Sequence, residues 1–247
     1  MENLDGKTAL ITGGNSGIGY ATAKELKQQG AKVIITGRRK DAIDKAATEL
    51  GVIGMVADQG KLEDIEKLAA VLKSQDHKID ILFINAGVLE MSAIEHATEK
   101  AFDNVMNVNF KGAYFTLSRV IPLLNNGASV VFLSSNTASM NGAQSSMYSS
   151  GKAALNAIMR IAAVELAPRG IRVNAVSPGP TATAILGKLG LSGQQLAELT
   201  ENMIERIPLK KIGKAEDVGK MVAYFSSEAS SFITGAEIIM DGGMSLL

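Results

Sequence analysis

Cysteine and tryptophan are absent from the 247-residue sequence, and histidine occurs only at His77 and His96. A chain without cysteine forms no disulfides and offers no thiolate to a metal ion. The two histidines lie in dissimilar polar surroundings and do not suggest a shared ligand set. We therefore expect no protein metal site.

An excess of charge of one sign is also missing, because 25 basic residues balance 25 acidic ones. No basic run is longer than Arg38-Arg39-Lys40, so the electrostatic footprint of a nucleic-acid-binding protein is absent. No apolar stretch approaches the roughly 20 residues that a membrane span needs, and the first residues do not resemble a secretion signal. We expect a cytoplasmic protein that acts on a small molecule, without nucleic-acid or membrane partners.

What the sequence does contain is a regular alternation of short apolar runs and amphipathic stretches. The runs predict strands buried on both faces, at Thr8–Thr12, Val33–Thr36, Val52–Ala57, Ile79–Ile84, Ser129–Leu133, Val173–Val176 and Glu237–Met240. The stretches predict helices near residues 17–29, 40–50, 61–75, 98–124, 146–168 and 215–227. This order predicts an α/β fold, a single-domain doubly wound parallel sheet with helices on both faces, over residues 1–247.

In such a fold, ligands bind beyond the carboxyl ends of the strands. The segment at about residues 183–206 breaks the alternation and carries Gly187, Gly190 and Gly193. We expect it to form a lid over this edge of the sheet.

A glycine-rich turn joins the first predicted strand to the first helix, with the sequence Thr12-Gly13-Gly14-Asn15-Ser16-Gly17-Ile18-Gly19. Glycine allows a tight turn and a close approach to a pyrophosphate, and the helix start directs N–H groups at the phosphates. An ordinary strand-to-helix turn is the alternative interpretation. We favour a dinucleotide site.

The residues after the second strand predict which dinucleotide binds. A carboxylate about 20 residues after the glycines would favour NAD(H), but this chain has Gly37-Arg38-Arg39 there. Two guanidinium groups can pair with the 2′-phosphate of NADP(H). We therefore expect NADP(H), and NAD(H) if both arginines are solvated loop residues.

Tyr148 and Lys152 are four residues apart and so lie on one face of a predicted helix. A nearby ammonium group favours phenolate and lowers the tyrosine pKa from about 10, which suits proton exchange with a substrate oxygen. Tyr20 and Lys24 have the same spacing, but they lie on the first helix, where amphipathic packing explains them. Tyr148 instead opens a helix just beyond the fifth strand, which ends in Ser134 and Ser135.

Together these motifs resemble the classical short-chain dehydrogenase/reductase family. The family motif Thr-Gly-x3-Gly-x-Gly matches Thr12 to Gly19, and its Asn-Ala-Gly motif matches residues 85–87. The resemblance implies four catalytic residues. Ser135, thirteen residues before the tyrosine, would bind the substrate carbonyl, and Tyr148 would be the acid or base. Lys152 would bind the nicotinamide ribose and lower the pKa of Tyr148, and Asn109 would hold a water molecule in a proton relay.

The resemblance also implies a set of cofactor contacts. Asp58 would bind the adenine amino group, although a helix N-cap explains it equally well, and Pro178 and Gly179 would lie against the nicotinamide carboxamide. A second basic residue that relatives sometimes carry in the glycine loop is replaced by Asn15-Ser16, and an additional Pro180 has no N–H to donate. The full expected set is Thr12, Gly13, Asn15, Ser16, Gly17, Ile18, Gly19, Arg38, Arg39, Asp58, Asn85, Ala86, Gly87, Tyr148, Lys152, Pro178, Gly179, Thr181 and Thr183.

The expected activity is hydride transfer between NADP(H) and a ketone, aldehyde or secondary alcohol, as in a carbonyl reductase. Two alternatives are a reductase of 3-oxoacyl thioesters on an acyl carrier protein and a noncatalytic nucleotide-binding sensor on the same fold. Apolar candidates for the substrate pocket are Met140, Met147, Ile185, Leu186 and Leu189. The resemblance further implies a homotetramer that forms through the helices near 98–124 and 146–168 and the C-terminal strand.

Overall fold

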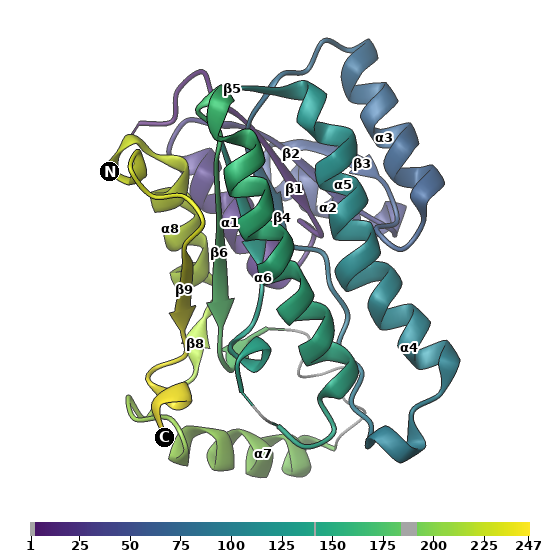
Figure 1. Cartoon of the computed structure of the whole chain (residues 1–247), viewed down its shortest axis with the longest axis vertical. Coiled ribbons are helices and arrows are strands. Elements are labelled where there is room, and N and C mark those ends of the chain that lie inside the picture. Colours follow the sequence, from purple (N-terminus) through teal and green to yellow (C-terminus); the bar gives the residue numbers. More distant parts are fainter. Residues whose placement is uncertain (1–2, 141, 184–191) are drawn as a thin grey trace.

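The computed structural model describes residues 3–140, 142–183 and 192–247. Its centre is a parallel seven-stranded sheet of strand order β3-β2-β1-β4-β5-β6-β9 (Figure 1). The strands are β1 (Thr8–Thr12), β2 (Lys32–Gly37), β3 (Ile53–Val56), β4 (Ile79–Ile84), β5 (Leu124–Leu133), β6 (Arg172–Pro178) and β9 (Glu237–Met240). The order changes direction between β1 and β4, and a ligand crevice is expected at such a switch point. A separate two-stranded sheet pairs β7 (Thr181–Ala182) with β8 (Gly213–Lys214).

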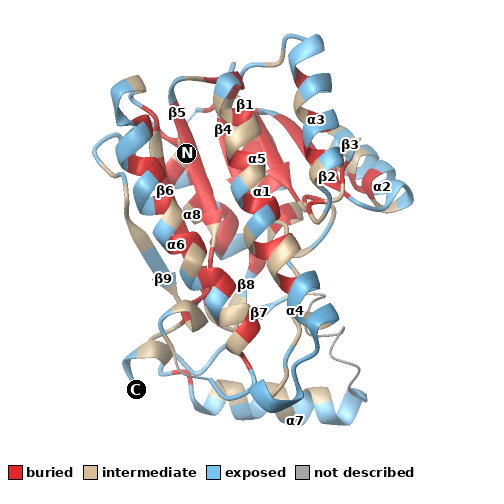
Figure 2. Cartoon of the chain, turned by 45° about the vertical axis from the view of Figure 1, so that its right-hand side comes forward, coloured by how far each residue is buried: buried red, intermediate tan, exposed pale blue. Residues whose placement is uncertain are grey.

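Helices cover both faces of the sheet. One face packs against α3 (Leu62–Ser74), α5 (Ala113–Val120) and α6 (Ser146–Leu166), and the other packs against α1 (Gly17–Gln28), α2 (Lys40–Leu50) and α8 (Ala215–Ser226). Successive strand side chains alternate between the two cores, so Leu10 lies in the first and Ile11 in the second. Figure 2 shows the buried strands between these helices. The predicted doubly wound α/β fold is confirmed.

The two edge strands depart from the predicted burial on both faces. Strand β3 alternates between half-buried and exposed residues, and Val56 is 52 % exposed. Strand β9 likewise carries the exposed Ile238 and Ile239. The prediction is wrong at both edges because an edge strand has a neighbour on one side only, and its apolar sequence does not reveal that position.

The predicted long helix over residues 98–124 is also wrong in detail. The segment forms α4 (Glu99–Met106), a π-helical stretch (Asn107–Gly112), α5 and a 3₁₀ turn (Ile121–Leu123), and β5 begins at Leu124 instead of Ser129. The backbone at Gly112 passes so close to the Gln59 carbonyl that a Cβ there would lie 2.0 Å from its oxygen. This approach accompanies the widened turn, and Pro122 stands in the 3₁₀ turn that ends the helical run.

The predicted lid contains a helix that the glycine-rich sequence did not suggest. Residues 184–191 lie outside the described residues, but α7 spans Gly193–Glu205. Ser192 caps it, and Gln195 completes a capping box. The Ser-x-x-Gln pattern was the available sequence signal. No helix in the described ranges has the length and apolar character to cross a lipid bilayer.

Candidate active site

A cavity of about 780 Å³ lies at the carboxyl ends of the strands, and residues of α7 line part of it. This volume falls within the range of cofactor and ligand pockets. Residues from distant parts of the chain line it. The predicted site residues among them are Gly13, Asn15, Ser16, Gly17, Ile18, Arg38, Arg39, Asp58, Asn85, Ala86, Gly87, Ser135, Tyr148, Lys152, Pro178, Gly179, Thr181 and Thr183.

The glycine loop lies at one end of this cavity. Gly13 and Gly17 have φ angles of +65° and +54°, in the left-handed region that favours glycine. A Cβ on Gly19 would lie 2.3 Å from the Gly13 carbonyl oxygen, so only glycine lets α1 start this close to the turn. Ser16, the N-cap residue of α1, makes no side-chain cap bond within the described residues. The first N–H groups of α1 are thus suited to bind phosphate oxygens.

Thr12 and Asn85 fix the glycine loop from behind. The Thr12 hydroxyl accepts hydrogen bonds from the backbone N–H groups of Asn85 and Ala86, both at 3.0 Å. The Asn85 amide donates to the carbonyl oxygens of Thr12 at 2.8 Å and Gly13 at 3.1 Å. Thr12 and Gly19 do not themselves line the cavity. They hold the loop in shape, and Asn85 connects the end of β4 to the end of β1.

The arginines that follow β2 lie beside the same cavity. Arg38 and Arg39 are exposed and line it, as does Asp58 beyond β3. The Asp58 carboxylate accepts the N–H of Gly60 at 3.0 Å, while Lys61 is the N-cap residue of α3. Asp58 therefore closes a turn before α3 instead of capping that helix. Within the described residues this end of the cavity has more positive than negative charge.

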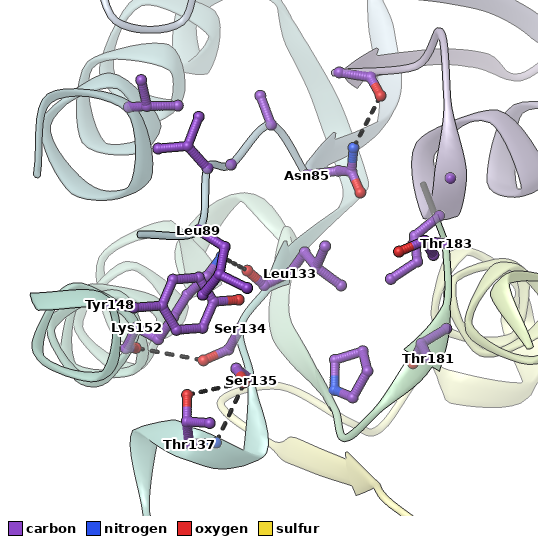
Figure 3. A pocket seen from close by; sticks show the side chains of 18 of the residues that line it. Asn85, Leu89, Leu133, Ser134, Ser135, Thr137, Tyr148, Lys152, Thr181 and Thr183 are labelled. Carbon is purple, nitrogen blue, oxygen red and sulfur yellow. Dashed lines mark hydrogen bonds between the residues drawn. The ribbon is translucent and has the colours of Figure 1, made fainter. Parts of the chain in front are cut away.

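Ser135, Tyr148 and Lys152 come together in the same cavity, at the end of β5 and the start of α6 (Figure 3). The Ser135 hydroxyl is 7 % exposed and accepts hydrogen bonds from the N–H and hydroxyl groups of Thr137, at 3.2 and 3.0 Å. Lys152 Nζ lies 5.7 Å from the centroid of the Tyr148 ring. The ammonium group donates to the Leu133 carbonyl at 2.7 Å, which ties α6 to the end of β5.

The protonation of this pair differs from the expectation drawn from spacing alone. Burial raises the pKa of Tyr148, and the hydrogen bond with Ser135 lowers it by less. Burial also lowers the pKa of Lys152 to about 8. The expected lowering of the tyrosine pKa by the ammonium is thus wrong for the protein alone, because desolvation opposes charge on both partners.

Asn109 is fully buried in the π-helical stretch and does not line the cavity. Its side-chain amide exchanges two hydrogen bonds with the backbone of Val88, accepting from the N–H and donating to the carbonyl, both at 2.8 Å. A Cβ on Gly87 would lie 3.3 Å from Asn109 Oδ1 and 3.7 Å from Lys152 Nζ. Asn109 therefore lies close to Lys152 and holds the loop after β4 beside it.

The cavity wall includes the expected lid and one segment that the sequence analysis did not name. One face of α7, within the lid, lines the cavity with Leu199, Asn202 and Met203, followed by Arg206 after its end. Met244 joins them from the C-terminal segment, which carried no sequence signal for this role. Asn136, which directly follows Ser135, lines the cavity as well. Of the predicted apolar wall, Met140 lines the cavity, Met147 is buried outside it, and Ile185, Leu186 and Leu189 lie outside the described residues.

A doubly wound sheet with a glycine-rich turn after β1 and a Ser-Tyr-Lys set beyond β5, both lining one cavity, is the arrangement of a dinucleotide-dependent oxidoreductase. Comparison with known proteins agrees. Residues 13–245 match the family model described as enoyl-(acyl carrier protein) reductase. The human dehydrogenase/reductase SDR family member 4 is 35 % identical, over 97 % of this chain and 88 % of that protein.

Two solved structures share the fold closely. A short-chain dehydrogenase/reductase from Brucella melitensis, titled a glucose/ribitol dehydrogenase, superposes with a TM-score of 0.92 at 28 % identity and covers 99 % of both chains. A blue fluorescent protein from a metagenomic library, solved in complex with NADPH, has a TM-score of 0.89 at 26 % identity and covers 98 % of this chain and 99 % of that one. The chain belongs to the short-chain dehydrogenase/reductase family and is an oxidoreductase.

Proposed function

We propose that this oxidoreductase is an NADPH-dependent carbonyl reductase that converts a ketone or aldehyde to an alcohol. The observation that carries the proposal is the convergence of Ser135, Tyr148 and Lys152 on the cavity that also contains the glycine loop. Bound NADPH supplies the hydride that reaches the carbonyl carbon.

The residues of this chain then have distinct roles in the reaction. The Ser135 hydroxyl donates a hydrogen bond to the carbonyl oxygen and holds it beside Tyr148. The Tyr148 hydroxyl transfers its proton to that oxygen as the C–H bond forms, which leaves phenolate on the enzyme and alcohol as product. A raised tyrosine pKa keeps the phenol protonated before the reaction. Lys152, held by Leu133, stabilises the phenolate when it forms.

The apolar lining supports a ketone with a sizeable hydrocarbon part as substrate. Met91, Met140, Met203 and Met244 all line the cavity. Methionine side chains adapt to varied shapes, which favours a broad range of ketones. The expected lid at about residues 183–206, which includes α7, would close over such a substrate.

The activity is tested by following NADPH absorbance at 340 nm with a panel of small ketones. Tyr148→Phe removes the transferable proton and should lower kcat at least 100-fold, as expected for loss of a general acid. Tyr20→Phe is the matched control, because Tyr20 begins the other Tyr-x3-Lys pair, does not line the cavity, and donates its hydroxyl to the exposed Glu49 at 3.3 Å. Equal activity of the wild type and Tyr148→Phe would contradict the proposal.

The cofactor preference is tested separately at the two arginines. Arg38→Ala and Arg39→Ala should each lower kcat/KM for NADPH about 10- to 100-fold while changing that for NADH little, because a charge-assisted hydrogen bond to phosphate is lost. Lys40→Ala is the control, since Lys40 is exposed and paired with Asp44 away from the cavity. Faster turnover of NADH by the wild type would overturn the role of the arginines.

The two alternatives make different predictions in the same assay. A carrier-protein reductase would use a 3-oxoacyl thioester on the carrier with a far lower KM than the free thioester. Basic residues beside the cavity would suit an acidic carrier protein, and Lys210 follows the lid segment. Its amine already donates to the Glu205 carbonyl at the end of α7, which does not favour this role. A noncatalytic sensor would bind NADPH, shown by titration, without consuming it for any substrate.

A further inference from the structure

Asp241 lies directly after β9 and collects several hydrogen bonds although it is only 8 % exposed. Its Oδ1 accepts the N–H of Gly243 at 2.9 Å. Its Oδ2 accepts the N–H of Ser245 at 2.8 Å and the side-chain amide of Asn136 at 3.3 Å. The two backbone bonds shape the C-terminal turn. The bond to Asn136 serves no part of that turn and reaches across to the catalytic side of the cavity.

Asn136 connects Asp241 to Ser135. It directly follows Ser135 and begins the 3₁₀ turn Asn136–Ala138, which Ser135 caps through the N–H of Thr137. The Asn136 side chain is 4 % exposed, so its amide depends on protein partners. Apart from Asp241, the side-chain partners of its amide among the described residues are the sulfur atoms of Met140 and Met244, which are weak acceptors.

Asp241 also packs against the segment that follows β6. A Cβ built on Gly179 would lie 2.5 Å from the Cβ and 2.9 Å from the Cα of Asp241. The Gly179 N–H donates to the Met240 carbonyl at 3.0 Å. Gly179 lines the cavity in the segment expected to meet the nicotinamide. One residue outside the catalytic set therefore contacts both the Ser135 turn and the Gly179 backbone.

We propose that Asp241 is a positioning residue. It fixes Ser135 through Asn136, and it sets the position of the Gly179 backbone in the part of the cavity expected to hold the nicotinamide. This inference rests on the proposed dinucleotide site. Asp241 acts through its neighbours and does not line the cavity itself.

The negative charge of Asp241 matters because its two carboxylate oxygens accept hydrogen bonds from three N–H groups, those of Gly243, Ser245 and the Asn136 amide. A carboxylate offers only acceptors, so it satisfies all three donors at once. An asparagine in its place keeps the size but must turn its NH₂ group toward one of the donors. Asp241→Asn therefore leaves at least one buried donor without an acceptor and lets the two segments shift relative to each other.

The test compares binding of NADPH with binding of adenosine 2′,5′-bisphosphate, a fragment that lacks the nicotinamide half. For Asp241→Asn we expect the Kd for NADPH to rise about tenfold, while the Kd for the fragment stays within about twofold, since only the nicotinamide end is displaced. With a ketone substrate, kcat should fall about tenfold as Ser135 loses its position. If the wild type prefers NADH, the same comparison uses NADH and ADP.

Two further variants separate positioning from general stability. Asn136→Ala removes the contact between the Ser135 turn and Asp241 whichever way the new amide at position 241 is turned, so it should reproduce the loss of nicotinamide affinity. Combining it with Asp241→Asn should give less than the sum of the two losses, because both variants act on the same contact. Glu237→Gln is the matched control on the same strand, where Glu237 bonds to Ser177 at 2.5 Å, and it should leave both affinities unchanged. The proposal would be overturned if Asp241→Asn or Asn136→Ala binds NADPH as the wild type does. It would also be overturned if either variant loses equal affinity for NADPH and for the fragment. This outcome is independent of whether any ketone is reduced.

Discussion

Burial governs the ionisation of Lys152 more strongly than any partner does. The side chain is 2 % exposed, and its amine donates to a neutral carbonyl instead of a carboxylate. Its pKa is therefore lowered to about 8 by desolvation alone. A lysine that loses its proton near the working pH can relay protons to and from Tyr148, which fits the proposed acid–base role.

The lowered pKa of Lys152 predicts how stability depends on pH. Between pH 8 and about 10.5 the unfolded chain binds more protons at this residue than the folded chain does, so the free energy of unfolding rises with pH in this window. Below pH 8 the full cost of burying the charge remains, on the order of 3 kcal/mol. Lys152→Met removes this cost and the dependence.

Urea unfolding of the wild type and Lys152→Met at several pH values measures the difference. The stability of the wild type relative to the variant should increase as pH rises from 8 to 10. Lys24→Met, at the exposed counterpart on α1, should show no such trend. A wild-type stability that runs parallel to that of Lys152→Met across this range would show that Lys152 is not perturbed.

Among the elements, the π-helical stretch has the most specific effect on the site. Its wide turn carries Asn109 to the loop after β4, where the carbonyl and the NH₂ of the side-chain amide both bond to the Val88 backbone. A regular helix would bring different residues to this face. π-helical turns are frequent at functional sites, and here the turn supports the wall next to Lys152.

Replacing Asn109 should cost stability as well as activity. Asn109→Ala leaves the N–H and carbonyl of the half-buried Val88 without their side-chain partner, which should lower the free energy of unfolding by about 1–3 kcal/mol. Asn107→Ala is the control from the same stretch, because Asn107 is only half-buried and its side chain makes no hydrogen bond with the described residues. Denaturant unfolding checks both, and similar losses for the two variants would contradict the role of Asn109.

The elements also show how far the sequence alone leads. Strand and helix patterns predicted the parallel sheet, and the motif around Thr12 to Gly19 predicted a loop that the structure places at the cavity. The sequence did not predict the π-helical stretch, which coincides with the close approach of Gly112 to Gln59, because these residues are far apart in the chain. It also missed the contact between Asn136 and Asp241, which are 105 residues apart.

At the scale of the whole molecule, apolar side chains remain exposed in two areas. On α6, Ile161 is 57 % and Val164 75 % exposed. On and around the edge strand β9, Phe232, Ile238 and Leu246 are exposed as well. Apolar patches and an unpaired edge strand are unfavourable in water and mark surfaces that other chains cover. Both areas belong to segments through which the sequence analysis expects a homotetramer to form.

Light scattering after size-exclusion chromatography tests this assembly. We expect a mass close to four times the chain mass of 25.9 kDa. Val164→Asp places a charge in the α6 area and should give smaller species, because a charge buried in an interface without a partner is costly. Glu165→Asp, at the next and exposed position of α6, should not change the mass. A wild type that elutes with the mass of one chain would remove the tetramer, and the exposed residues of α6 and β9 would then need another explanation.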